Sequence, residues 1–147
     1  MTVSGISLAD ANIWLAIAVD GHIHHTAAAN WFNGQLDRAC AFCRITQLAL
    51  LRHLTNPKIM GVPNVQTQIE AWQTFEALAG DPRVVFHDEP PSLALAFKSL
   101  TQSSRSAHKL WTDAYLAAFA IGFGMEIVTL DADFKSFPGL SVTLLTP

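Results

Sequence analysis

The hydrophobic residues of this chain fall into short continuous runs, and these runs alternate with stretches in which apolar side chains recur at helical spacing. Continuous runs typical of buried strands cover residues 6–10, 39–44, 83–87, 126–130 and 141–145. Helical spacing is found over residues 12–19, from 22 onward, 46–54, 65–78, 92–100 and 110–123. Such alternation implies right-handed crossovers between parallel strands. We therefore predict an α/β protein with three layers (α/β/α) and a central, mainly parallel sheet of four to five strands.

The composition is that of a globular domain. Half of the 147 residues are hydrophobic and 14% are charged, and no linker-like segment divides the chain, so we predict a single domain over residues 1–147. The net charge of -3 argues against broad electrostatic binding of nucleic acid, but it does not exclude an acidic metal site. Because the chain shows neither a membrane-length apolar run nor a basic leader, we expect a cytoplasmic protein without membrane contact.

Two clusters of metal-binding residue types have simpler explanations. Cys40 and Cys43 have the spacing of a zinc or redox pair, but no second pair exists and they lie in a predicted strand, which favours two buried thiols. His22, His24 and His25 crowd a predicted helix start. Only His22 and His25 share a helix face, so a solvated helix start is favoured over a metal site.

The acidic residues give a stronger indication, because only twelve are present and five of them lie in predicted turns or on predicted exposed helix faces. Asp10 follows the first predicted strand, Asp131 follows the fourth, and Asp133 comes two residues later. Asp113 begins the helix that precedes the fourth strand. If the first and fourth strands are neighbours, Asp10, Asp113 and Asp131 meet at the carboxyl edge of the sheet, where ligands bind in such folds.

Carboxylates in one pocket repel each other, and a hard divalent cation relieves that repulsion. Asp10, Asp113 and Asp131 therefore predict a site for Mg²⁺ or Mn²⁺, with Asp133 either assisting or forming a simple turn. Thr129 shares a sheet face with Asp131 and either orients a ligand or is an ordinary strand residue. Asn12 either caps the first helix, which we favour, or contacts a metal-bound water.

These segments resemble a known family, the PIN-domain ribonucleases, and in particular the VapC-type toxins of bacterial toxin–antitoxin pairs. Leu8-Ala9-Asp10-Ala11-Asn12 is similar to the opening D-x-N motif. The run from Trp111 to Ala118 resembles the D-A-x-L-A-A helix, and the run from Val128 to Phe134 resembles the closing T-x-D-x-D-F motif. Residues 46–57 resemble a mid-chain segment of a mycobacterial-type branch. The resemblance implies a PIN-like domain that carries Asp10, Asp113, Asp131 and Asp133 as its catalytic carboxylates.

One position departs from the family pattern. Many members carry a Glu three residues after the Thr that opens the mid-chain helix. Here that Thr is Thr46, a predicted N-cap that is also a candidate for orienting a ligand or contacting phosphate, and the position of the Glu holds Ala49. Arg52 lies one turn further along. It is predicted either to contact phosphate or pair with Asp10 or Asp113, or else to be solvated.

By resemblance, the substrate is RNA of the tRNA or rRNA class, the cofactor is Mg²⁺ or Mn²⁺, and the partner is a small VapB-type antitoxin. A homodimer is also implied, with Trp14, Trp31, Phe32 and Trp72 as interface candidates or core residues. Two alternatives stay open. The first is a catalytically weak or inactive module that binds RNA or antitoxin, which the missing Glu permits. The second is a phosphatase of the haloacid dehalogenase type, because Asp131-Ala132-Asp133 matches its D-x-D motif, although that motif belongs on an early strand.

Overall fold

A computed structural model describes residues 5–146. Residues 1–4 and 147, which belong to the predicted domain of residues 1–147, lie outside the described residues. The described chain forms a sheet of five strands in the order β3-β2-β1-β4-β5, and every neighbouring pair is parallel. The strands are β1 (Ser7–Ala9), β2 (Cys40–Phe42), β3 (Val84–Phe86), β4 (Glu126–Thr129) and β5 (Ser141–Leu144). The predicted α/β class and the adjacency of the first and fourth strands are confirmed.

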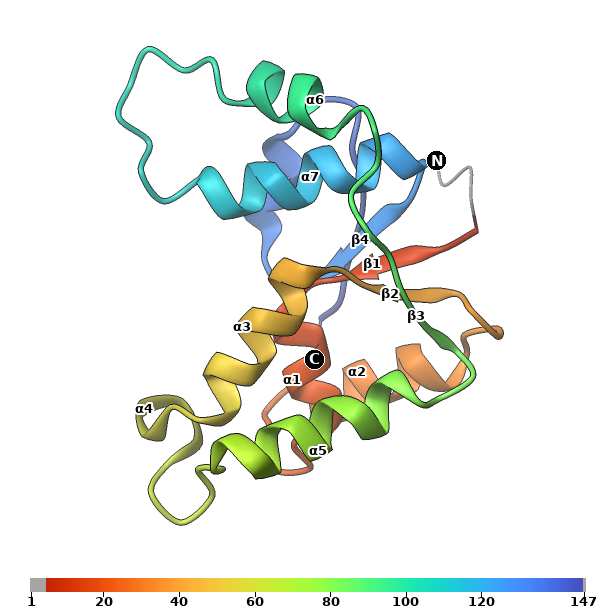
Figure 1. Ribbon diagram of the computed structural model, residues 1–147, viewed down its shortest axis with the longest axis vertical. Helices are drawn as coiled ribbons and strands as arrows, with labels where there is room; N and C mark the ends of the chain where they lie inside the picture. The colour runs from red at the N-terminus through yellow and green to blue at the C-terminus, as the bar shows by residue number, and fades with distance from the viewer. Residues whose placement is uncertain (1–4, 147) are drawn as a thin grey trace.

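Helices cover both faces of the sheet and give the predicted three layers (Figure 1). On one face lie α1 (Ala11–Ala18), α2 (His25–Asn33), α3 (Arg44–Leu54) and α5 (Gln68–Ala79). On the other lie α6 (Leu93–Leu100) and α7 (Trp111–Phe123). Each interface has its own core: Trp14 stacks on Phe42 at 4.0 Å between ring centroids in the first, and Phe119 packs with Ile127 in the second. These two cores hold the carboxyl ends of β1 and β4 at one edge.

Helix α3 begins before the predicted range of 46–54, and its buried side differs from the stripe of Leu48, Leu51 and Leu54 that the spacing of the leucines predicts. It begins at Arg44 with Cys43 as N-cap, and Thr46 sits one turn inside, where its hydroxyl accepts a hydrogen bond from the Cys43 amide at 3.0 Å. The prediction of Thr46 as N-cap is therefore wrong. Because Thr46 is buried, residues four and eight positions later, Leu50 and Leu54, are buried with it, and Leu48 is exposed.

Two short helices were not predicted from the sequence: α4 (Pro57–Met60) and the 3₁₀ helix η1 (Ala132–Ser136). Each begins after a residue whose side chain accepts a hydrogen bond from the helix, Asn56 for α4 and Asp131 for η1. Helix α2 begins at His25, because residues 19–24 form turns rather than the predicted early helical start. Cys40 and Cys43 are buried free thiols, as favoured above. No helix within residues 5–146 is both long and apolar enough to cross a membrane.

Candidate active site

The site is assembled where β1 and β4 end side by side. The pairing of Ala9 with Val128 brings the next residue, Asp10, beside Thr129, and the Asp10 amide donates to the Val128 carbonyl at 2.9 Å. Asp10 is the N-cap of α1, and its Oδ1 accepts from the Ala11 amide at 2.8 Å. Its Oδ2 accepts from the Thr129 hydroxyl at 2.9 Å. Strand pairing and helix capping thus fix the carboxylate of Asp10 on two sides.

The Thr129 hydroxyl also fixes the start of the next segment. It accepts from the Asp131 amide at 3.0 Å while it donates to Asp10, so a single buried oxygen joins two of the predicted site residues. Asp131 is in turn the N-cap of η1, and its Oδ1 accepts from the Asp133 amide at 2.9 Å. Asp133 is exposed, in keeping with its place in a turn.

Helix α7 brings the fourth carboxylate. Asp113 is in the first turn of α7 and is half-buried. Burial raises the pKa of Asp113 to about 6, and the charges of Asp10, Asp131 and Asp133 add to the increase. Burial likewise raises the pKa of Asp10. The hydrogen bonds that Asp10 accepts from Thr129 and Ala11 act to lower this pKa, and the charge of Asp131 acts to raise it. The structure therefore brings the other three predicted aspartates within electrostatic range of Asp113.

The chemistry of these donors fits a hard divalent cation. All four are carboxylates, and Mg²⁺ and Mn²⁺ prefer oxygen ligands and relieve like-charge repulsion. Within residues 5–146, however, no three His, Cys, Asp or Glu side chains are already gathered closely enough to hold a metal ion. Binding of the ion would have to draw Asp10, Asp113 and Asp131 closer together.

Asn12 lies on the first turn of α1 but does not cap it, because Asp10 does so; the favoured interpretation of Asn12 as the cap is wrong. Its Oδ1 is buried and finds no hydrogen-bond partner among the described residues. Such a buried acceptor is costly unless a donor reaches it. A ligand-bound water is one such donor, so the second predicted role of Asn12, contact with a metal-bound water, stays a prediction.

Helix α3 contributes a different residue from the one expected. Arg52 is exposed and lies with Trp72 in a groove between α3 and α5. The described residues show no ion pair between Arg52 and either Asp10 or Asp113, so the predicted pairing is wrong. The predicted contact of Arg52 with phosphate stays a prediction. The neighbouring His53 is half-buried instead, and its pKa is lowered by burial and by the charge of Arg52, while Asp10 raises it.

His53 was not predicted, because it is not a carboxylate and lies in the sequence apart from the cluster of His22, His24 and His25. Its Nδ1 is buried without a hydrogen-bond partner among the described residues, and the residue lies one helical turn beyond Ala49. Ala49 stands where the family pattern expects an acid, and residues four apart lie on the same side of a helix. This spacing was the signal for His53 that the sequence offered. The electrostatic influence of Asp10 on His53 places α3 at the border of the site.

A family model for the PIN domain matches residues 8–140, which cover every strand except the last and all four candidate aspartates. The chain belongs to the PIN-domain family. Its PIN domain is 40% identical to Ribonuclease VapC41 of Mycobacterium tuberculosis over 142 residues, covering 94% of this chain and 97% of the relative. It is 32% identical to Ribonuclease VapC29 of the same organism, covering 95% and 96%. The family match also removes the phosphatase alternative.

Solved structures of PIN-domain proteins share the fold at lower sequence identity. VapBC2 from Rickettsia felis, crystallised with a DNA fragment from its promoter, matches with a TM-score of 0.64 at 15% identity, covering 96% of this chain and 99% of that one. Mycobacterium tuberculosis VapC20, a toxin that cleaves the sarcin–ricin loop, matches with a TM-score of 0.62 at 16% identity, covering 91% and 98%. At these identities the likeness establishes the fold of the PIN domain.

Proposed function

We propose that this protein is a metal-dependent endoribonuclease, the toxin of a type II toxin–antitoxin system, which hydrolyses RNA phosphodiester bonds. The observation that carries the proposal is that Asp10 and Asp131 are joined through Thr129 at the carboxyl edge of β1 and β4, with Asp113 within electrostatic range of Asp10, Asp131 and Asp133. The relatives named as VapC ribonucleases support RNA as the substrate. The tRNA or rRNA class is retained from the family resemblance.

Each aspartate has a separate task in this proposal. Asp10, Asp113 and Asp131 hold Mg²⁺ or Mn²⁺, and Asp133, exposed beside them, takes part from the rim. When bound, the ion supplies an activated water and neutralises charge on the phosphate. Thr129 keeps Asp10 oriented, and its donated hydrogen bond opposes the rise that burial causes in the pKa of Asp10.

The proposed partners are a small VapB-type antitoxin and a second copy of the chain. Structures of VapBC complexes among the solved neighbours support the first. For the homodimer, Trp14 and Phe32 are buried in the core and so are not available, and Trp31 is half-buried. Trp72 is 46% exposed on α5 beside the exposed Leu48 of α3, so this face is the proposed dimer surface.

A second candidate is a module of this fold that binds RNA or antitoxin but cleaves weakly or not at all. Two observations favour it: Ala49 replaces the expected acid, and the carboxylates within residues 5–146 are not yet gathered around one point. The two candidates differ in one measurable property, which is turnover of RNA in the presence of a divalent ion.

The test is cleavage of total cellular RNA with Mg²⁺ or Mn²⁺, with and without EDTA, by the natural protein and by Asp10→Asn. Asn retains the capping ability of Asp10, so the helix should survive the change while the metal carboxylate is lost. Asp88→Asn is the matched control: it removes the same charge from an exposed residue that follows the edge strand β3. We expect EDTA and Asp10→Asn to abolish cleavage and Asp88→Asn to leave it unchanged.

Equal cleavage by the natural protein and Asp10→Asn would overturn the proposal. RNA that is bound by the natural protein but not cut under any divalent ion would favour the inactive module instead.

A further inference from the structure

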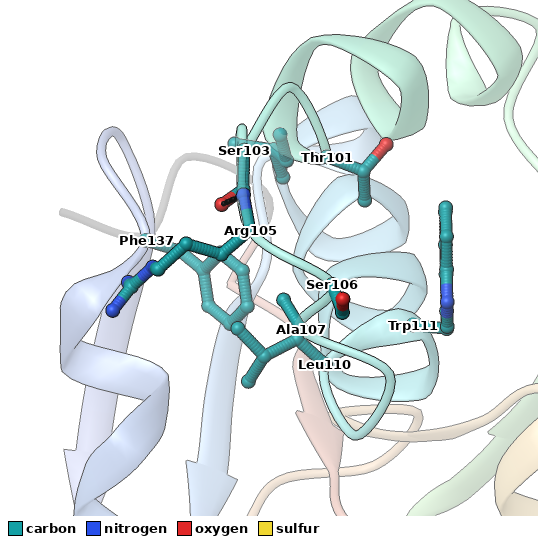
Figure 2. Close-up of a pocket in the computed structure, with 9 residues that line it drawn as sticks. Thr101, Ser103, Arg105, Ser106, Ala107, Leu110, Trp111 and Phe137 are labelled. Atoms are coloured by element: carbon teal, nitrogen blue, oxygen red, sulfur yellow. Dashed lines mark hydrogen bonds between the residues drawn. The ribbon is translucent and has the colours of Figure 1, made fainter.

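A cavity of about 150 Å³ lies between the end of α6, the loop of residues 101–110, the start of α7 and the residue that follows η1. Figure 2 shows Trp111 at one end, with Thr101 and Ser106 toward it. At the other end Arg105 extends across Phe137, and Leu110 lies below. The cavity thus has an apolar wall at each end with hydroxyls between them, and the Arg105 side chain extends outward past Phe137 at its rim.

The walls of this cavity are held in place. Trp111 is 54% exposed, yet its ring makes an edge contact with Phe97 at 6.1 Å between centroids. The Thr101 hydroxyl donates to the Phe97 carbonyl at 2.8 Å, which leaves the lone pairs of its oxygen able to accept. In the loop, Ala107 adopts a φ of 40°, in the left-handed region that non-glycine residues rarely occupy. Backbone strain of this kind clusters at ligand-binding sites, and here it lies four residues before the exposed ring of Trp111.

The same elements carry the candidate active site. Trp111 and Asp113 share the first turn of α7, and Phe137 directly follows η1, whose first turn contains Asp133. The cavity and the candidate active site are therefore built on adjoining residues of α7 and η1, and none of the four aspartates lines the cavity itself. This arrangement suits one substrate that spans both places.

The charge around the cavity is opposite in sign to that of the protein as a whole. Four of the nine Lys and Arg residues lie in the segments that line or adjoin it, and all four are exposed: Lys98, Arg105, Lys109 and Lys135. On a chain of net charge -3, such a group attracts a polyanion locally. The approach of phosphates beside an acidic centre is thereby favoured.

We infer that this cavity binds one unpaired nucleobase of the RNA substrate, with the base against Trp111 and the adjoining phosphate at Arg105. This inference rests on the proposed ribonuclease function. Single-stranded RNA is recognised by stacking of splayed bases on aromatic rings and Arg planes. A volume of about 150 Å³ lies well below the roughly 300–1,000 Å³ of sites for larger ligands. It suits one flat ring rather than a cofactor or a stretch of peptide.

The test is binding of a labelled, short single-stranded RNA, measured by fluorescence anisotropy with Mg²⁺ present. All proteins carry Asp10→Asn so that the RNA is not cut. Trp111→Ala should weaken binding roughly 5- to 150-fold, the effect of removing one base–aromatic stack. Trp111→Phe should restore most of the affinity. Arg105→Ala should weaken binding and flatten its salt dependence, whereas Lys58→Ala, an exposed charge on α4, should do neither.

An abasic oligonucleotide of the same length separates stacking from charge. We expect its affinity to be insensitive to Trp111→Ala and still sensitive to Arg105→Ala. If Trp111→Ala weakens RNA and the abasic chain equally, or weakens neither, the cavity does not bind a base and the inference is wrong. If the cavity binds a protein partner instead, Trp111→Ala should weaken the binding of neither the RNA nor the abasic chain. Failure of the proposed function is seen separately, as the absence of RNA cleavage by the natural protein.

Discussion

At the level of single residues, the Thr129 hydroxyl is the atom that joins the two strand ends of the site. It donates to Asp10 and accepts from the Asp131 amide, and it is completely buried. Thr129→Val keeps the shape of the side chain but leaves the Asp131 amide without its partner. We expect a loss of about 1–2 kcal/mol in the free energy of unfolding and a fall of about tenfold or more in RNA cleavage, measured by urea unfolding and by initial rates.

The control for this change is Thr143→Val in β5. The Thr143 hydroxyl donates to Glu126 at 2.7 Å, at the other end of β4 from the site. It should cost stability without a comparable loss of cleavage. A similar loss of cleavage in both variants would show that Thr129 acts only through stability.

The charge of Asp113 makes the stability of the metal-free protein depend on pH. The folded-state pKa of about 6 lies above the ordinary value of 3.8, so ionised Asp113 destabilises the folded state at neutral pH. As the pH falls through 6, Asp113 in the folded protein takes up a proton, and the destabilisation of the folded state declines. Below about pH 4 this destabilisation is absent. In EDTA at pH 7.5, Asp113→Asn should therefore raise Tm by roughly 2–4 °C, corresponding to about 1 kcal/mol after allowance for solvent screening.

Calorimetry in EDTA at a series of pH values would measure this effect. The increase in Tm that Asp113→Asn causes should become steadily smaller between pH 6 and pH 4. A constant advantage at all these pH values would contradict the link to the Asp113 carboxyl group.

At the level of elements, α7 contains a glycine whose absence of a side chain is required by packing. A Cβ at Gly122 would lie 2.7 Å from Pro90 Cγ and 2.9 Å from Ser92 Oγ. Ala is the better helix former, but Gly122→Ala should still lower the free energy of unfolding by about 1–3 kcal/mol because the chain at residues 90–92 must move. Gly34→Ala is the control, since its Cβ would meet only the Trp31 and Asn30 carbonyls, at ordinary distances of 3.6 and 3.9 Å. Denaturant unfolding of both variants distinguishes packing from propensity.

The elements were largely predictable from the sequence, and the deviations have local causes. Continuous apolar runs gave all five strands, because buried parallel strands lack polar alternation. The face of α3 was mispredicted because a pattern of leucines does not reveal that buried Thr46 sets its orientation. Arg52 was predicted near the site in place of His53 because the orientation of α3 was wrong. Adjacent residues on a helix point in directions about 100° apart, so a small error in orientation changes which of them faces the site.

The positions of the four aspartates were easier to predict than their contacts. Strand order brings Asp10 and Asp131 together whatever their rotamers, whereas the double role of Thr129 and the cavity beside Trp111 depend on side-chain positions that no spacing rule contains.

At the level of the whole molecule, the acidic centre links metal binding to folding. The unfolded chain holds no assembled set of carboxylates, so an ion that binds the folded state stabilises it by about 2.7 kcal/mol at one hundred times its Kd. We expect Mn²⁺ or Mg²⁺ to raise Tm of the natural protein and of Asp88→Asn, and to have little effect on Asp131→Asn. Thermal unfolding followed by circular dichroism measures this directly. An equal rise in all three proteins would locate the ion elsewhere.

The strand order has a consequence for the cell that makes this protein. β4 inserts between β1 and β5, so Asp10 near the beginning of the chain gains its Thr129 partner from a residue 119 positions later. During synthesis the polypeptide grows from its N-terminus, and a nascent chain that has not yet released β4 lacks both Thr129 and Asp131. The proposed nuclease would therefore stay inert until β4 and Asp131 had been synthesised, and the messenger and ribosome that produce it would meet an active enzyme only after that point.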